Sequence, residues 1–169
     1  QAFPRALLPL SSAISAARQF FPTIPIYILI VVAGKLFLDD TTLPGINANY
    51  LLLPILFVLL VITSFGLSLL FATMNVYFRD TTKLLSYIMR IWLYASPVLW
   101  QPDMLNGSYR IILYLNPLGP ILSANSRIWI DGLMPTASQL IGCLFWALFS
   151  FLLGGYFFIS RERDFAVRI

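Results

Sequence analysis

The side chains best suited to binding chemistry form a stripe along an apolar segment of the sequence, residues 83–101. Their separations of four, three, four and seven residues place them on one face of a helix with 3.6 residues per turn. Because an arginine facing lipid would cost ~2.5 to 3.5 kcal/mol, Arg90 is expected to face protein or water. Two interpretations stay open: Arg90 reaches a membrane interface or pairs with one carboxylate, or the whole stripe lines a polar passage. The stripe consists of Lys83, Tyr87, Arg90, Tyr94 and Gln101.

Aromatic side chains are frequent in and around this segment. Tyrosine and tryptophan combine a flat apolar face with a hydrogen-bonding edge, which suits sugar rings. Near a membrane surface the same rings commonly act as anchors, and that alternative stays open. The rings concerned are Tyr77, Phe78, Trp92, Trp100, Tyr109 and Tyr114.

Other chemistry is disfavoured by what the sequence lacks. It has no histidine, and its single cysteine, Cys143, lies inside an apolar run. A metal centre, a disulfide framework or a histidine-based catalytic site is therefore not expected. Gly34 and Lys35 belong to no glycine-rich phosphate loop, so no nucleotide site is predicted in this chain. An enzyme acting at the membrane interface, such as a glycosyl- or acyltransferase, would depend on Asp103 or Asp131, and both fit solvated turns better.

The composition predicts an all-α, polytopic membrane protein. Of 169 residues 59% are hydrophobic and only 11% are charged, far from the balance of a soluble domain. Crossing a hydrocarbon core of about 30 Å takes ~20 helical residues. The apolar pieces within residues 103–135 are too short to span and predict re-entrant or interfacial helices. Four segments are predicted to span: Phe20 to Leu38, Tyr50 to Met74, Leu84 to Gln101 and Ser138 to Ser160.

Proline, small residues and basic residues refine this topology. Pro97 should kink or end the third span near Ser96. Lysine and arginine are denser on the side that holds both ends of the chain, which predicts a cytoplasmic C-terminus. Small residues recur on the second span beside Gly66 and predict close packing with another helix or a second copy. They are Ser64, Ser68, Ala72 and Asn75.

Four stretches of the sequence together resemble the type-two ABC transporter permeases that export polysaccharides such as O-antigen, teichoic acid and galactan. They are "FPRALLPLSS", "NVYFRDTTKLLSYIMRIWLYASPVLW", "YLNPLGPILSANSR" and "SRERDFAVRI". By this resemblance residues 1–169 would form a single transmembrane permease domain that holds the family's third to sixth spans. The first two spans and an N-terminal interface helix would be missing.

The resemblance also implies partners and residue roles. The chain would be a transport subunit of the bacterial cytoplasmic membrane that pairs with a second copy of itself and with a separate ATP-binding subunit, which would hold the ATP and Mg. The cargo would be a lipid-linked polysaccharide, with a permease for a drug or a lipid as the alternative. No cofactor, metal, catalytic residue or nucleic acid is expected. The implied residues are Phe3, Pro4, Arg5, Arg79 and Asp80 for coupling to the ATPase, and Tyr87, Arg90, Trp92, Tyr94, Trp100 and Gln101 for the substrate conduit.

Overall fold

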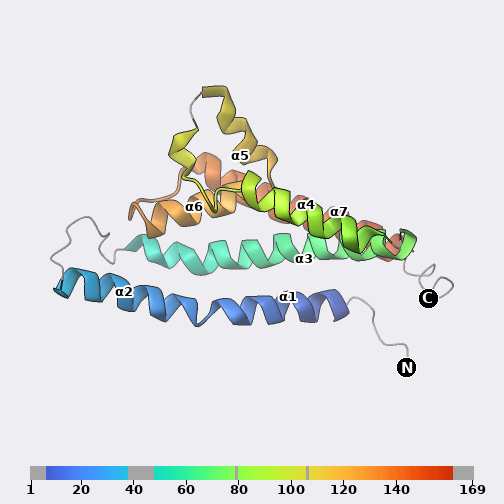
Figure 1. The fold of residues 1–169 in the computed structure, drawn as a ribbon, viewed down its shortest axis with the longest axis horizontal. Coiled ribbons are helices and arrows are strands. Elements are labelled where there is room, and N and C mark those ends of the chain that lie inside the picture. Colours follow the sequence, from blue (N-terminus) through green and yellow to red (C-terminus); the bar gives the residue numbers. More distant parts are fainter. Residues whose placement is uncertain (1–6, 38–47, 79, 106, 162–169) are drawn as a thin grey trace.

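The computed structural model describes residues 7–37, 48–78, 80–105 and 107–161, and all the regular elements among them are helices (Figure 1). The predicted all-α class is confirmed for this part of the chain. In chain order the elements are α1 (Leu7–Phe20), α2 (Thr23–Phe37), η1 (Ala48–Leu52), α3 (Leu53–Tyr77), α4 (Thr81–Ala95), η2 (Pro102–Met104), η3 (Gly107–Arg110), α5 (Ile111–Leu115), α6 (Gly119–Trp129) and α7 (Ala137–Arg161).

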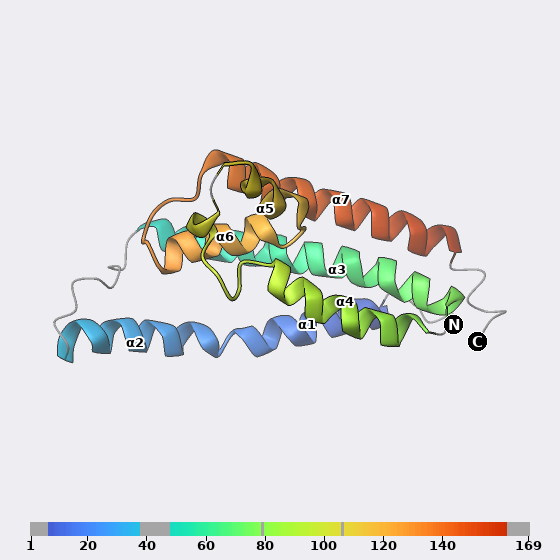
Figure 2. The same cartoon turned by 45° about the horizontal axis from the view of Figure 1, so that its top comes forward.

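Helices α3 and α7 form the centre of the molecule. They are 25 residues each and lie side by side in both views (Figures 1 and 2). Two glycines meet where they cross: a Cβ on Gly66 would overlap the backbone of Ser150, and one on Gly154 would overlap the carbonyl oxygen of Gly66. The absence of both side chains lets the two backbones touch, as is usual where membrane helices pack tightly.

Helix α6 is inserted against this pair. Its residues Ile121, Ala124 and Ile128, spaced three and four apart, are fully buried and pack on Leu56 of α3 and Cys143 of α7. A helix of 11 residues cannot span a bilayer, so the prediction that the apolar pieces within residues 103–135 are too short to span is confirmed.

Helices α1 and α2 follow one another almost in line along the outside of α3 (Figure 1). The break at residues 21–22 arises because Pro22 and Pro25 lack the N–H groups needed to continue the hydrogen-bond ladder. The predicted start of this span at Phe20 was wrong. The apolar helical stretch already begins at Pro9 and runs to Gly34, and Phe20 and Phe21 pack on the ring of Phe57 in α3.

The predicted number of spans also needs correction. In the described residues three helical stretches are long and apolar enough to cross a membrane: Pro9–Gly34, Ala48–Tyr77 and Ala137–Arg161. The third predicted span ends as α4 at Ala95, and its 15 residues reach only ~22 Å. The reason is Pro97: the residue before a proline disfavours helical dihedrals, and Ser96 is extended, with φ −96° and ψ 148°. The predicted end near Ser96 is therefore confirmed.

An aromatic cluster joins α2, η1 and α6 at the opposite end from the α3–α4 turn. The ring of Trp129 lies 4.3 Å from that of Tyr27 and 5.3 Å from that of Tyr50, both edge-on. The Tyr27 hydroxyl also donates a hydrogen bond to the carbonyl oxygen of Trp129. These contacts fix α2 to the rest of the bundle.

Removing the Trp129 ring should loosen this attachment. For Trp129→Ala we expect a lower melting temperature of the detergent-purified protein, with a cost approaching the ~3 to 5 kcal/mol typical of a truncated aromatic core residue. Trp129→Phe keeps a ring in the cluster and should lose less than half as much. Equal destabilisation by both variants would show that the ring contacts are not what holds α2.

Candidate functional site

The predicted stripe on α4 is exposed along its length. Tyr87 and Tyr94 expose 67% and 65% of their surface, and Lys83 and Arg90 are exposed as well. All four lie within one continuous helix, so the prediction that they share a face holds. Among the described residues no carboxylate forms an ion pair with Arg90. The four side chains, called the α4 stripe below, therefore turn away from the bundle of their own chain.

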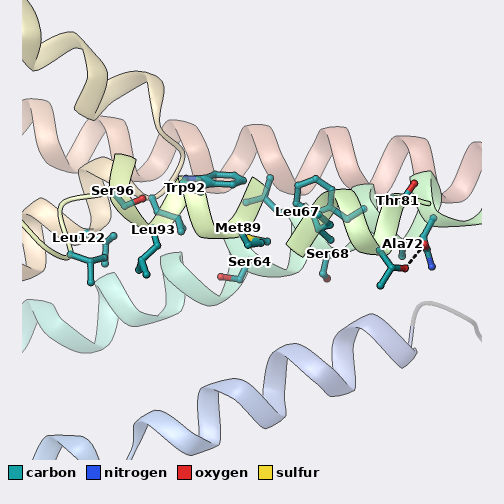
Figure 3. Close-up of a pocket in the computed structure, with 16 residues that line it drawn as sticks. Ser64, Leu67, Ser68, Ala72, Thr81, Met89, Trp92, Leu93, Ser96 and Leu122 are labelled. Carbon is teal, nitrogen blue, oxygen red and sulfur yellow. Dashed lines mark hydrogen bonds between the residues drawn. The ribbon is translucent and has the colours of Figure 1, made fainter. Parts of the chain in front are cut away.

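The opposite face of α4 borders a cavity of about 590 Å³ that lies between α4 and α3 (Figure 3). Leu85, Met89 and Trp92 line it from α4. From α3 the lining includes the small residues that were expected to support close helix packing. Ser64, Ser68, Ala72 and Asn75 face this cavity, because the helix turns a different side, which carries Gly66 and Phe65, toward α7.

Two polar attachments hold α4 at its ends. At its start, the hydroxyl of Thr81 donates to the carbonyl oxygen of Met74 at 3.4 Å, and that of Thr82 donates to Oδ1 of Asn75 at 2.9 Å. At its end, the indole N–H of Trp92 donates to Oδ1 of Asn116 at 2.7 Å.

Between these attachments the helix is loosely packed on its own chain. From Lys83 to Ala95 only Leu85 and Trp92 are partly buried, and every other residue is exposed. The structure therefore separates Trp92 from the α4 stripe and places it on the side of the bundle.

The two remaining conduit candidates lie beyond the end of α4. The indole N–H of Trp100 donates to the carbonyl oxygen of Tyr94 at 3.0 Å. This bond places Trp100 beside Tyr94, at the C-terminal end of the α4 stripe. Gln101 is exposed and borders a different, small polar cleft of about 30 Å³. That volume is close to one water molecule and far below the size of a sugar.

This small cleft contains the two carboxylates that an enzyme would need. Asp103 and Asp131 both line it and both are exposed, and beside them Arg127 donates from Nε to the carbonyl oxygen of Met134 at 3.0 Å. Within the described ranges no three His, Cys, Asp or Glu residues gather in a way that could hold a metal ion.

The coupling candidates lie mostly outside the described residues: Phe3, Pro4, Arg5 and Arg79. Asp80 is described, precedes the first turn of α4, is exposed and makes no capping hydrogen bond. Figure 2 shows that the start of α1, the α3–α4 turn and the end of α7 all lie at one end of the molecule. At this end the guanidinium of Arg161 lies 5.8 Å from the ring centre of Tyr77.

One polar residue of the region was missed from the sequence. Asn116 is 9% exposed and connects the end of α4 to the junction of α5 and α6. Its only signal is the following proline, since the pair Asn-Pro in "YLNPLGP" marks an extended position without saying what the amide contacts.

Comparison with known proteins identifies relatives of this chain. Residues 8–130 match the family model described as ABC-2 type transporter. Two proteins of Klebsiella pneumoniae named O-antigen export system permease protein RfbA are 29% and 27% identical over 132 and 130 residues. These alignments cover 78% and 77% of this chain and 48% of each relative. A protein of the same name from Myxococcus xanthus is 25% identical over 175 residues, covering 99% of this chain and 62% of the relative. The chain thus spans about half of the length of the two Klebsiella relatives and somewhat more of the third.

Proposed function

Because the chain belongs to the ABC-2 type transporter family, we propose that it is a membrane permease subunit of an ATP-driven exporter of a lipid-linked polysaccharide. The relatives named above are O-antigen export permeases, which favours a glycan cargo over a drug or a simple lipid. ATP and Mg would bind to a separate subunit, and two permease copies would act together in the bacterial cytoplasmic membrane.

The α4 stripe is the observation that carries this proposal. A helix among membrane-spanning helices that turns Arg90 and two tyrosines away from its own bundle needs water, protein or a polar cargo on that side, because lipid would penalise the charge. Tyr87 and Tyr94 offer flat rings to sugar faces, while Arg90 can donate several hydrogen bonds to hydroxyl or phosphate oxygens. Trp100 extends the ring surface beyond Tyr94. In the proposed dimer this stripe would face the seam between the two copies, with Gln101 just beyond its outer end.

Coupling would occur at the end of the molecule that holds Asp80. The start of α1, the α3–α4 turn and the end of α7 gather there, which gives an ATP-binding subunit one surface on which to push (Figure 2). On this proposal Phe3, Pro4, Arg5, Arg79 and Asp80 contact the partner subunit, this end is cytoplasmic, and so is the C-terminus.

The cargo class can be tested by ATP hydrolysis. In liposomes containing the permease and its ATP-binding subunit, a polyprenyl-linked oligosaccharide should stimulate ATP hydrolysis several-fold, because only a bound cargo completes the transport cycle. The free oligosaccharide and an amphiphilic drug serve as controls and should not stimulate. Stimulation by the drug alone would contradict the glycan assignment and favour the drug or lipid permease.

A further inference from the structure

We propose that Asn116 is a positioning residue that fixes the C-terminal end of α4, called its outer end below, to the α5–α6 junction. It thereby sets the location of Tyr94 and Trp100. This inference rests on the proposed function, since it concerns the helix that would line the conduit. It adds a residue outside the α4 stripe, one that is itself only 9% exposed.

Both polar atoms of the Asn116 amide form hydrogen bonds. Nδ2 donates to Oγ of Ser96 at 2.8 Å and to the carbonyl oxygen of Ala95 at 3.3 Å. Oδ1 accepts from the indole of Trp92 at 2.7 Å and from the backbone N–H of Leu118 at 3.0 Å. An asparagine amide has two N–H donors and an oxygen with two lone pairs, so these four bonds use its full capacity.

The end of α4 leaves polar groups that need a hydrogen-bond donor from another element. The last carbonyl groups of a helix have no partner within it, and Pro97 cannot supply a following N–H. Ser96 is only 1% exposed, so water does not reach its hydroxyl readily. A buried hydroxyl without a hydrogen-bond partner is costly, and Nδ2 of Asn116 provides that partner from another element while also donating to the carbonyl oxygen of Ala95.

The attachment matters for function because α4 has few others. The helix is exposed over most of its length, and the cavity of about 590 Å³ behind it leaves room for its outer end to move. Ala95, which Asn116 binds, directly follows Tyr94, and Trp100 is bonded to the carbonyl oxygen of Tyr94. Loss of the amide would therefore displace the outer rings of the proposed conduit while the inner attachment at Thr81 and Thr82 stays in place.

The test compares Asn116→Ala with a matched control, Asn125→Ala. Asn125 also donates from Nδ2, but to the carbonyl oxygen of Ile121 within its own helix, and is partly buried. In the assembled transporter we expect Asn116→Ala to lower glycan export about tenfold while basal ATP hydrolysis, measured without cargo, stays within about twofold of wild type. Asn125→Ala should leave both rates near wild type. Unchanged export in Asn116→Ala would overturn the inference.

A spectroscopic readout separates positioning from general damage. With 5-fluorotryptophan labelling each tryptophan gives one ¹⁹F resonance, and Trp92→Phe and Trp129→Phe identify those of Trp92 and Trp129. Asn116→Ala should shift the Trp92 resonance and leave that of Trp129 in place. If both move together, the variant disturbs the whole bundle and the positioning role is contradicted.

Two further outcomes, failure of Asn116→Ala to assemble and absence of export by the unmodified transporter, also have a defined meaning. If Asn116→Ala fails to assemble, Ser96→Ala serves in its place, because it removes only one acceptor of the amide. We expect this variant to export about two- to fivefold less glycan than wild type. Export by Ser96→Ala at the wild-type rate would then overturn the inference. If the unmodified transporter exports no lipid-linked glycan, the proposed function fails, whereas normal export by wild type and by Asn116→Ala alike refutes the positioning role alone.

Discussion

Replacing Gly154 by alanine is expected to destabilise the protein strongly, while the same change at the neighbouring Gly155 should be tolerated. A Cβ on Gly154 would overlap the backbone carbonyl of Gly66 across the α3–α7 crossing. Around a Cβ on Gly155 nothing lies within 4 Å. Because a backbone atom cannot swing aside as a side chain can, α3 and α7 must separate, and such overpacking costs about 1 to 3 kcal/mol or more.

The pair of variants makes this a matched experiment. Both replace a glycine of one helix by alanine, so the effect on helix propensity is shared and the difference reports the crossing. The measurement is the melting temperature of the purified protein, together with its yield in the membrane. The interpretation of the crossing is refuted if the two variants melt at the same temperature.

The long helices could be predicted from the sequence because uninterrupted apolar runs allow little else in a membrane. The segments predicted at Tyr50 to Met74 and Ser138 to Ser160 correspond to the structure within three residues at each end. The end of α4 could also be predicted, because Pro97 restricts the backbone of the residue directly before it, Ser96. The start of the first span could not be predicted in this way. The prolines near residue 22 interrupt the apolar run, whereas α1 continues to pack on α3.

Contacts between distant elements could not be read from spacing. Helical periodicity groups Lys83, Tyr87, Arg90 and Tyr94 on one face, but it does not say which face of α4 meets the bundle. The sequence likewise shows Gly66 beside several small residues, and only its contact with Gly154 reveals that the glycine and the small residues have different neighbours. The role of Asn116 depends on Trp92 and Ser96, which are 24 and 20 residues away along the chain.

On the proposed function, replacing Arg90 by leucine is expected to abolish most glycan export while the protein still folds and pairs with the proposed ATP-binding subunit. The side chain is exposed on α4 and forms no ion pair with a described carboxylate, so the contacts that hold the described helices together do not include it. Its guanidinium would instead bind hydroxyl or phosphate oxygens of the cargo. Hydrogen bonds to a charged group contribute about 1.5 to 3 kcal/mol each, so losing one predicts a roughly ten- to hundredfold fall in export.

Two control variants distinguish this explanation from a general effect of charge. Arg90→Lys keeps the charge without the planar set of donors and should retain part of the export. Arg110→Leu removes an exposed arginine outside the α4 stripe and should export normally. If Arg90 faced lipid, leucine would improve membrane insertion by a few kcal/mol at the helix centre and leave export intact. A more stable, fully active Arg90→Leu transporter would therefore rule out a conduit along α4.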